Sequence, residues 1–363
     1  MSLRVFIVAG DRSGDNHAAR LMQAIKDREP TAVFTGIGGT AMIEAGLVPL
    51  MPFEHMNVSG FWEVLRRYRS LRAAFDTTLH YARTESFDLF IPVDYPGFNL
   101  PLARDFRRRG IPVFWYIAPQ LWAWGQWRAR QLAEAVDRLF VVLPFEVEFF
   151  HRMGIPAEFY GHPFMDDPAY AQPPAEEKEP FSIALLPGSR AHERALHYTV
   201  MLEIAHRLHQ KDTRWQFLVA TEPSAERNIP PYIHFLPDAK EVLHRARYGL
   251  IKAGTSTLEA MLANVAQVTM YRASLGTYVT ARMLVKIPFV ALPNIVLGEK
   301  VVPEIVQWTA RTGKILRALE ELMGNPQQVL QQHQAAQRIR SMLGASGVSA
   351  RIADRILTLL GRA

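Results

Sequence analysis

Short apolar runs alternate with helical stretches along the first 165 residues of this chain. The runs at residues 4–9, 33–36, 89–93, 113–117 and 139–142 have the length and composition of buried strands. Strands that alternate with helices predict a parallel sheet covered on both faces, and such sheets bind ligands at the carboxyl ends of their strands. The polar or glycine-bearing turns of this half follow those ends.

The same alternation returns in the second half, where the runs at 182–186, 215–220, 233–236, 248–251 and 265–271 predict further strands. Residues 171–180 are rich in Pro and Glu and have no apolar period, which is typical of a linker. The fold class is therefore α/β, with two parallel-sheet domains. We expect an N-terminal domain at 1–165, a linker at 166–180, a second domain at 181–335, and C-terminal helices at 336–363 that can pack back on the first domain.

Composition narrows the classes of function. The 363 residues, 49% of them hydrophobic, suffice for two domains with cores of their own. The net charge of +6 suits an acidic ligand or an anionic membrane surface and is too small to indicate nucleic acid. The absence of cysteine excludes disulfides and thiolate chemistry, and no histidine pair has convincing metal-ligand spacing. Residues 1–10 predict a strand rather than a signal peptide, and no apolar run is long enough to span a membrane, so we expect a cytoplasmic protein.

Residues 252–260, Lys-Ala-Gly-Thr-Ser-Thr-Leu-Glu-Ala, form the most informative turn. Gly254 allows the backbone to approach a ligand, and the free N–H groups of the helix that follows attract an anion. This pattern predicts a diphosphate site, with Glu259 accepting hydrogen bonds from a ribose. An ordinary strand-to-helix turn, with Glu259 stabilising the helix N-terminus, is the alternative. The hydroxyls available at this turn belong to Thr255, Ser256 and Thr257.

Other turns offer similar pairs of interpretations. Arg190 either binds a phosphate in a bidentate manner or forms a surface salt bridge. Gly14 lies in a loop that either approaches a sugar or phosphate or makes a tight turn. Asp94 follows a strand directly and is either a general base or a turn carboxylate. Trp122 either lines a sugar-binding wall or packs in the core, and Asn294 either reads a base or sugar or caps a turn.

Residues 61–75 predict a basic amphipathic helix, because apolar residues recur there at spacings of three and four between arginines. Such a helix lies in a membrane interface or buries its apolar stripe in the core. If it meets a membrane, we expect its first turn to enter lipid and its arginines to lie at anionic headgroups. The residues expected to make this contact are Phe61, Trp62, Leu65, Arg66 and Arg69.

Two parallel α/β domains with a phosphate turn in the second suggest a GT-B glycosyltransferase, and the sequence resembles the lipid-A-disaccharide synthase family. The segments that carry the resemblance occur in family order over nearly the whole chain: AGDRSGD at 9–15, GIGG at 36–39, EVL at 63–65, DYPGFNL at 94–100, WAW at 122–124, LPFE at 143–146, GHP at 161–163, LLPGSR at 185–190, GTSTLE at 254–259, YR at 271–272, LPN at 292–294 and VPE at 302–304. The residues at which this sequence differs from the usual family pattern fall in the N-terminal half, and they bear on the preference for acceptor and acyl chain. They are Asp11, Asn57, Gly97, Ala118 and Gly125.

The resemblance implies two domains facing a central cleft and an inverting transfer of 2,3-diacylglucosamine from UDP-2,3-diacylglucosamine to 2,3-diacylglucosamine 1-phosphate. It implies no cofactor and no metal. Asp94 would be the general base, and Arg190 with the residue 254–257 helix start would stabilise the departing UDP. The enzyme would act peripherally on the inner face of the cytoplasmic membrane, and a homo-oligomer is compatible with it. Further substrate-binding residues would be Glu259, Arg272, Asn294 and Glu304.

Two other classes of function remain open. One is a different GT-B enzyme that uses a UDP-sugar, such as an epimerase or a soluble transferase. The other is a non-catalytic protein that binds a nucleotide sugar.

Overall fold

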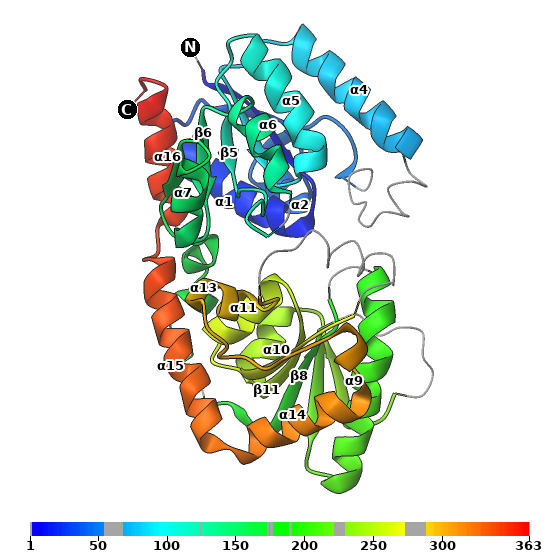
Figure 1. The fold of residues 1–363 in the computed structure, drawn as a ribbon. Helices are drawn as coiled ribbons and strands as arrows, with labels where there is room; N and C mark the ends of the chain where they lie inside the picture. The colour runs from blue at the N-terminus through cyan, green and yellow to red at the C-terminus, as the bar shows by residue number, and fades with distance from the viewer. Residues whose placement is uncertain are drawn as a thin grey trace. The chain divides into compact units, whose positions relative to one another are not determined.

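The computed structural model describes residues 2–53, 68–123, 125–172, 174, 177–188, 191–220, 229–272 and 288–362. They form two units, each with its own sheet and core (Figure 1). Unit 1 comprises Met1–Asp166 and Leu343–Ala363, and unit 2 comprises Asp167–Met342. The expected pair of parallel-sheet α/β domains is thus confirmed.

Unit 1 is built on a sheet of seven described strands, all parallel, in the order β3-β2-β1-β4-β5-β6-β7. Rings from β1, β4 and a neighbouring helix fill the centre of its core: Phe90 and Phe106 stack 4.5 Å apart, and Phe6 lies 5.4 Å from Phe106. The strands are β1 (Arg4–Ala9), β2 (Val33–Ile37), β3 (Leu47–Pro49), β4 (Leu89–Val93), β5 (Phe114–Tyr116), β6 (Arg138–Val141) and β7 (Ala157–Phe159).

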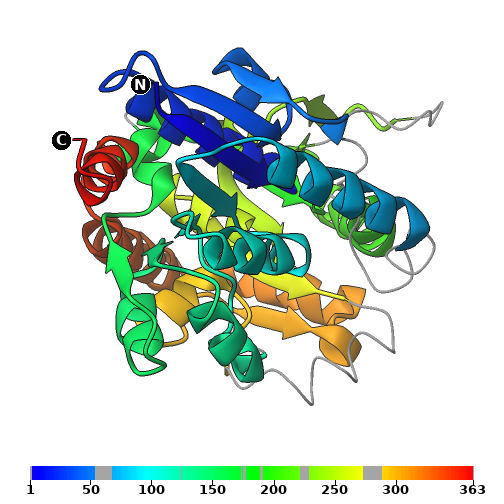
Figure 2. The same cartoon turned by 90° about the horizontal axis from the view of Figure 1, so that it is seen from above.

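The helices of unit 1 cover the sheet, and all those described except α16 connect its strands (Figure 2). They are α1 (Arg12–Lys26), α2 (Thr40–Glu44), α4 (Tyr68–Thr84), α5 (Pro96–Arg108), α6 (Ala129–Ala133), α7 (Pro144–His151) and α16 (Val348–Leu359), with 3-10 turns η2 (Gln126–Arg128) and η3 (Pro163–Asp166). The helix expected at 61–75 is described only from Tyr68, and it continues past residue 75 to Thr84.

The last helix, α16, joins unit 1 although it ends the chain. It packs beside α1, as the red and blue helices of Figures 1 and 2 show. The Asp166 carboxylate accepts the backbone N–H groups of Gly347, Val348 and Ser349 at 2.6–2.8 Å, which satisfies the free donors of the first turn of α16. Arg355 adds an ion pair to Glu158 at 2.8 Å.

Unit 2 has a parallel sheet of six described strands in the order β10-β9-β8-β11-β12-β13. The strands are β8 (Glu179–Leu186), β9 (Gln216–Ala220), β10 (Ile233–Leu236), β11 (Ala246–Lys252), β12 (Ala266–Tyr271) and β13 (Glu304–Val306). The helices are α8 (Pro168–Ala171), α9 (Ala191–Lys211), α10 (Ala239–Arg245), α11 (Thr255–Leu262), α13 (Leu292–Leu297), α14 (Thr312–Gly324) and α15 (Pro326–Leu343), with the 3-10 turn η4 (Gln307–Thr309). The segment expected as a linker contains α8 and the first residues of β8.

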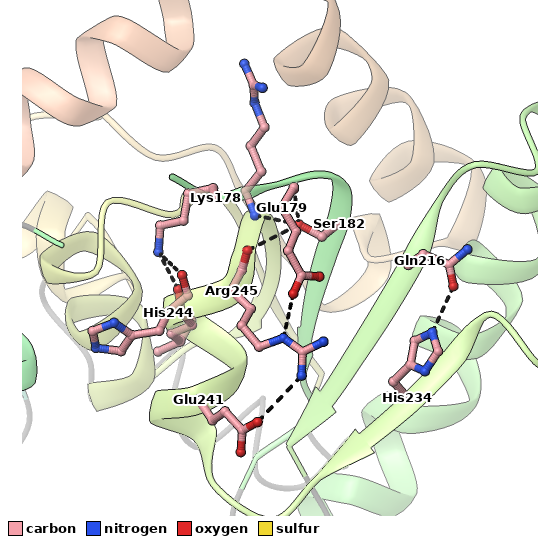
Figure 3. A network of polar contacts seen from close by, with 10 residues as sticks. Lys178, Glu179, Ser182, Gln216, His234, Glu241, His244 and Arg245 are labelled. Atoms are coloured by element: carbon pink, nitrogen blue, oxygen red, sulfur yellow. Dashed lines mark hydrogen bonds and ion pairs between the residues drawn. The ribbon is translucent and has the colours of Figure 1, made fainter. Parts of the chain in front are cut away.

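A polar network fixes the amino-terminal ends of the unit 2 strands (Figure 3). Lys178 donates to the backbone carbonyls of Leu243 and His244 at 2.6 and 2.9 Å, which caps the end of α10. Arg245 pairs with Glu179 at 2.6 Å. These contacts anchor the sheet at the end opposite to the turns in which ligand contacts are expected. In the described part of the chain, no helix combines the length and apolar character needed to cross a membrane.

Candidate functional site

Asp94 lies half-buried at the carboxyl end of β4, in a turn of uncommon backbone geometry. Asp94 and Tyr95 have φ values of +44° and +49°, in the left-handed region that non-glycine residues rarely adopt. The buried Asn99 side chain holds this turn by donating to the Asp94 carbonyl at 2.8 Å. The Asp94 N–H donates to the Tyr116 carbonyl at 3.0 Å. Because such strain persists only where the surroundings impose it, this carboxylate is a strong candidate for function.

The turn after β1 lies against the Asp94 turn. A Cβ atom on Gly10 would be 2.3 Å from the Tyr95 ring, so only glycine fits there. Gly14 lies in the first turn of α1, where its N–H donates to the Asp11 carboxylate at 2.8 Å. That N–H is therefore engaged within the protein, and a contact between Gly14 and a ligand stays a prediction.

Asp15 is buried and has a part that no local sequence pattern predicts. Its carboxylate accepts the N–H groups of Gly39, Ala41 and Met42 at 2.7–3.2 Å. This is helix capping supplied by another helix, since Asp15 belongs to α1 and the donors to the start of α2. The turn at 36–39 is thus fixed by a structural carboxylate from α1.

Trp122 packs in the core of unit 1. It is only 7% exposed, its ring meets Phe145 edge-on at 5.1 Å, and its Nε1–H donates to Glu146 at 2.8 Å. Glu146 also accepts the N–H groups of Val142 and Leu143. Burial raises the pKa of Glu146 to about 7, although these three donors act in the opposite direction.

In unit 2, the turn at Gly254 has the geometry expected of an anion site. Gly254 caps α11 with φ +148°, a value that favours glycine. Thr255 is exposed and Ser256 half-buried at the start of this helix. The Thr257 hydroxyl donates to the Gly254 carbonyl at 2.7 Å and accepts the Leu292 N–H at 3.1 Å, so it serves the fold. Backbone N–H groups in the first helical turn have no intrahelical acceptor and attract anions.

Lys252, at the start of this turn, is a further cation to which the sequence pattern assigned no role. Its Nζ atom lies 2.7 Å from the Glu193 carboxylate and near the space beside Gly254. Glu259 lies on the next turn of α11, where it accepts a hydrogen bond from the Tyr170 hydroxyl at 3.1 Å. Burial raises the pKa of Glu259.

Glu304 and Asn294 organise the segment before β13. One Glu304 oxygen accepts the N–H groups of Val290 and Ala291 and the Asn294 amide at 2.8–3.0 Å. The fully buried Asn294 amide also donates to the Val302 carbonyl and accepts two backbone N–H groups. All hydrogen-bonding positions of this amide are thus used, and contact of Asn294 or Glu304 with a ligand stays a prediction.

Arg272 follows β12, and its guanidinium donates to the Ala310 carbonyl at 2.8 Å. Its backbone N–H donates to Nε2 of the buried His197 at 2.9 Å, which leaves the proton of that ring on Nδ1, next to the Glu193 carbonyl. Arg272 is therefore already bonded inside unit 2, and a contact between Arg272 and substrate stays a prediction.

Several predicted residues lie outside the described residues: Arg190 on the donor side, and Phe61, Trp62, Leu65 and Arg66 of the amphipathic helix. Arg69 is described and exposed on α4. Farther along α4, the Phe75 ring packs edge-on against Phe98 at 5.4 Å, so this part of the stripe belongs to the core. Among the described residues, no group of His, Asp and Glu side chains is arranged to hold a metal ion.

Solved structures with low sequence identity share this fold over nearly the full chain. A complex of S. aureus MnaA with UDP has a TM-score of 0.70 at 11% identity, and the match covers 99% of this chain and 98% of that one. The calicheamicin glycosyltransferase CalG4 has a TM-score of 0.63 at 16% identity, with 100% and 99% covered. The fold is therefore of the GT-B type, which glycosyltransferases and epimerases share.

Sequence comparison is more specific than the fold. The family model described as lipid-A-disaccharide synthetase matches residues 5–353. The lipid-A-disaccharide synthase of Anaeromyxobacter dehalogenans strain 2CP-C is 36% identical over 376 residues, covering 98% of this chain and 97% of the relative. The lipid-A-disaccharide synthase of Geobacter metallireducens is 34% identical over 375 residues, and the match covers 99% of this chain and 98% of the relative. The chain belongs to the lipid-A-disaccharide synthetase family.

Proposed function

We propose that this protein catalyses the reaction after which its family is named. It transfers 2,3-diacylglucosamine from UDP-2,3-diacylglucosamine to 2,3-diacylglucosamine 1-phosphate, giving the β-1,6 lipid A disaccharide 1-phosphate and UDP. The observation that carries this proposal is the similarity to curated lipid-A-disaccharide synthases over 98–99% of the chain.

On the donor side, Arg190 and the start of α11 bind the diphosphate of UDP. The φ of Gly254 and the exposure of Thr255 support this role, because a glycine and an exposed residue at the start of α11 let an anion approach the positive end of the helix. Negative charge grows on the departing UDP, and the positive end of the helix together with the arginine stabilises it. Glu259 accepts hydrogen bonds from the ribose hydroxyls.

On the acceptor side, Asp94 is the general base. The acceptor 6-oxygen attacks the anomeric carbon of the donor, the bond from that carbon to the phosphate oxygen breaks, and Asp94 takes the hydroxyl proton. A single displacement of this kind turns an α-linked donor into a β-linked product. The strained turn after β4, fixed by Asn99, supports this assignment.

Because both substrates carry acyl chains, the protein works at a membrane surface. We place it peripherally on the inner face of the cytoplasmic membrane, with the first turn of the amphipathic helix in the lipid interface. The exposed Arg69 on α4 supports this placement, since arginine at that position can meet anionic headgroups.

The test is an assay of UDP release from UDP-2,3-diacylglucosamine, with and without 2,3-diacylglucosamine 1-phosphate. A disaccharide synthase releases UDP only when the acceptor is present. Release without acceptor, or epimerisation of the donor, would assign another UDP-sugar enzyme, and tight UDP binding without turnover would assign a binding protein. In calorimetry, Arg190→Ala is expected to weaken UDP binding by about 1.5–3 kcal/mol through loss of a charge-assisted contact. Unchanged UDP affinity would remove Arg190 from the site.

A further inference from the structure

A buried tyrosine donates a hydrogen bond to Glu259. Tyr170, on the short helix α8, is 1% exposed, and its hydroxyl donates to the Glu259 Oε1 atom at 3.1 Å. The two residues are 89 positions apart in sequence, so only the fold of unit 2 brings them together. Glu259 rises from the second turn of α11, one turn beyond the proposed diphosphate site.

Helix α8 is itself held firmly, so the hydroxyl has a defined position. Asp167 caps α8 by accepting the Ala169 N–H at 3.2 Å, and the same carboxylate pairs with Lys240 of α10 at 2.5 Å. The Tyr170 N–H donates to the Asp167 carbonyl at 2.9 Å. A tyrosine fixed at its backbone and packed along its ring loses little entropy when it donates a hydrogen bond.

We propose that Tyr170 is a positioning residue for the donor nucleotide, holding Oε1 of Glu259 so that the carboxylate presents its remaining acceptor sites to the ribose hydroxyls. This inference rests on the ribose-binding role proposed for Glu259. A carboxylate accepts about four hydrogen bonds, and the vicinal hydroxyls of a ribose supply two donors. The Tyr170 and Ser256 hydroxyls use two of these acceptor sites and leave two for the ribose hydroxyls.

The Tyr170 hydroxyl also affects the pKa of Glu259, together with the charged groups around that carboxylate. Burial raises the pKa of Glu259, while the Tyr170 hydrogen bond, the Lys240 charge and the Ser256 hydroxyl lower it, and Asp238 raises it further. The pKa of Tyr170 is raised by burial and by the neighbouring carboxylates, among them Asp167, so the phenol stays a neutral donor. Removing the hydroxyl therefore loosens the carboxylate and raises its pKa further.

The experiment compares UDP with 2′,3′-dideoxy-UDP as ligands of the full chain in calorimetry. Tyr170→Phe keeps the ring and is expected to weaken UDP binding about 3- to 10-fold, the range of one hydrogen bond, and to leave dideoxy-UDP binding unchanged. The donor KM rises with little change in kcat, and the pH below which UDP binding declines moves upward. Tyr160→Phe is the matched control, because it removes a tyrosine–glutamate bond of 2.8 Å in unit 1.

Equal UDP affinity in Tyr170→Phe and the parent would overturn the inference. Equal weakening for both nucleotides would overturn it as well, since a structural defect does not discriminate between them. Glu259→Gln distinguishes a failure of the positioning role of Tyr170 from a failure of the ribose-binding role of Glu259. If it weakens UDP binding while Tyr170→Phe does not, only the role of Tyr170 fails; if it too leaves UDP binding unchanged, the proposed ribose role of Glu259 fails.

Discussion

Lys252 and Glu193 tie together two neighbouring strand ends of unit 2. The Lys252 Nζ atom lies 2.7 Å from the Glu193 carboxylate, and the two side chains are 16% and 10% exposed. Lys252 ends β11, and Glu193 lies in the first turn of the helix that follows β8, its neighbour in the sheet. The pair therefore holds together the two turns that are proposed to meet the diphosphate.

Lys252→Met should destabilise the protein by about 2–4 kcal/mol, because it leaves the largely buried Glu193 carboxylate without this counter-charge. The double variant with Glu193→Gln should recover part of the loss, giving a coupling energy of about 1 kcal/mol or more in urea denaturation. Arg130→Met is the control: its pair with Glu134 is 90% and 56% exposed and should contribute little. If the losses in unfolding free energy of Lys252→Met and Glu193→Gln simply add in the double variant, the pair does not contribute to stability.

Asp94→Asn should lower turnover by about 100-fold or more, because an amide cannot act as a base toward the 6-hydroxyl group of the acceptor sugar. UDP affinity should stay nearly unchanged. Steady-state kinetics and calorimetry give the two values. Asp76→Asn, which alters an exposed carboxylate paired with Arg72 on α4, is a control for general effects of charge. Near-normal turnover in Asp94→Asn would remove it from the role of base.

His162 should make the protein sensitive to acid. Its ring is buried and its Nδ1 accepts the Phe164 N–H, which requires the neutral form; burial, and then nearby His17, lower the pKa of His162 to about 3. Between about pH 6.5 and pH 3 the folded protein thus binds fewer protons than the unfolded chain, so this stability is complete above pH 6.5 and falls as the pH falls.

The expected loss from this group between about pH 7.5 and pH 5 is about 2 kcal/mol. His162→Asn supplies a neutral acceptor to Phe164 and should flatten the dependence by that amount. Urea denaturation of both proteins at the two pH values gives the difference. Parallel pH dependences for parent and variant would mean that His162 is protonated in the folded state.

Charge reversal at Arg66 and Arg69 should reduce binding to anionic vesicles. Each arginine near an anionic membrane surface contributes about 1 kcal/mol to the binding free energy, and salt weakens this attraction. Activity on vesicle-borne substrate should fall, whereas activity on short-chain soluble analogues should survive. Arg130→Glu provides a control at an exposed arginine of α6, a different helix of unit 1. Sedimentation of the reversed variant with vesicles at the parent's level would place the interfacial surface elsewhere.

The sequence could predict those elements whose pattern lies within a few consecutive residues. Apolar runs predicted most of the strands, but three strands of three residues each, β3 (Leu47–Pro49), β7 (Ala157–Phe159) and β13 (Glu304–Val306), are too short to show a period and were missed. The Gly254 turn and Asp94 could be found because glycine geometry and a strand-end carboxylate are visible in a few residues. The Tyr170–Glu259, Lys252–Glu193 and Asp15–Gly39 contacts join residues 89, 59 and 24 positions apart, and no local pattern encodes them.

The most direct measurement is the NMR structure of the product formed from UDP-2,3-diacylglucosamine and 2,3-diacylglucosamine 1-phosphate. The proton coupling at the new anomeric centre reports its configuration, and the carbon shifts report which hydroxyl is substituted. The reaction proposed here predicts a β linkage to the 6-oxygen of the acceptor. An α linkage, attachment at another hydroxyl, or the absence of any disaccharide would contradict it.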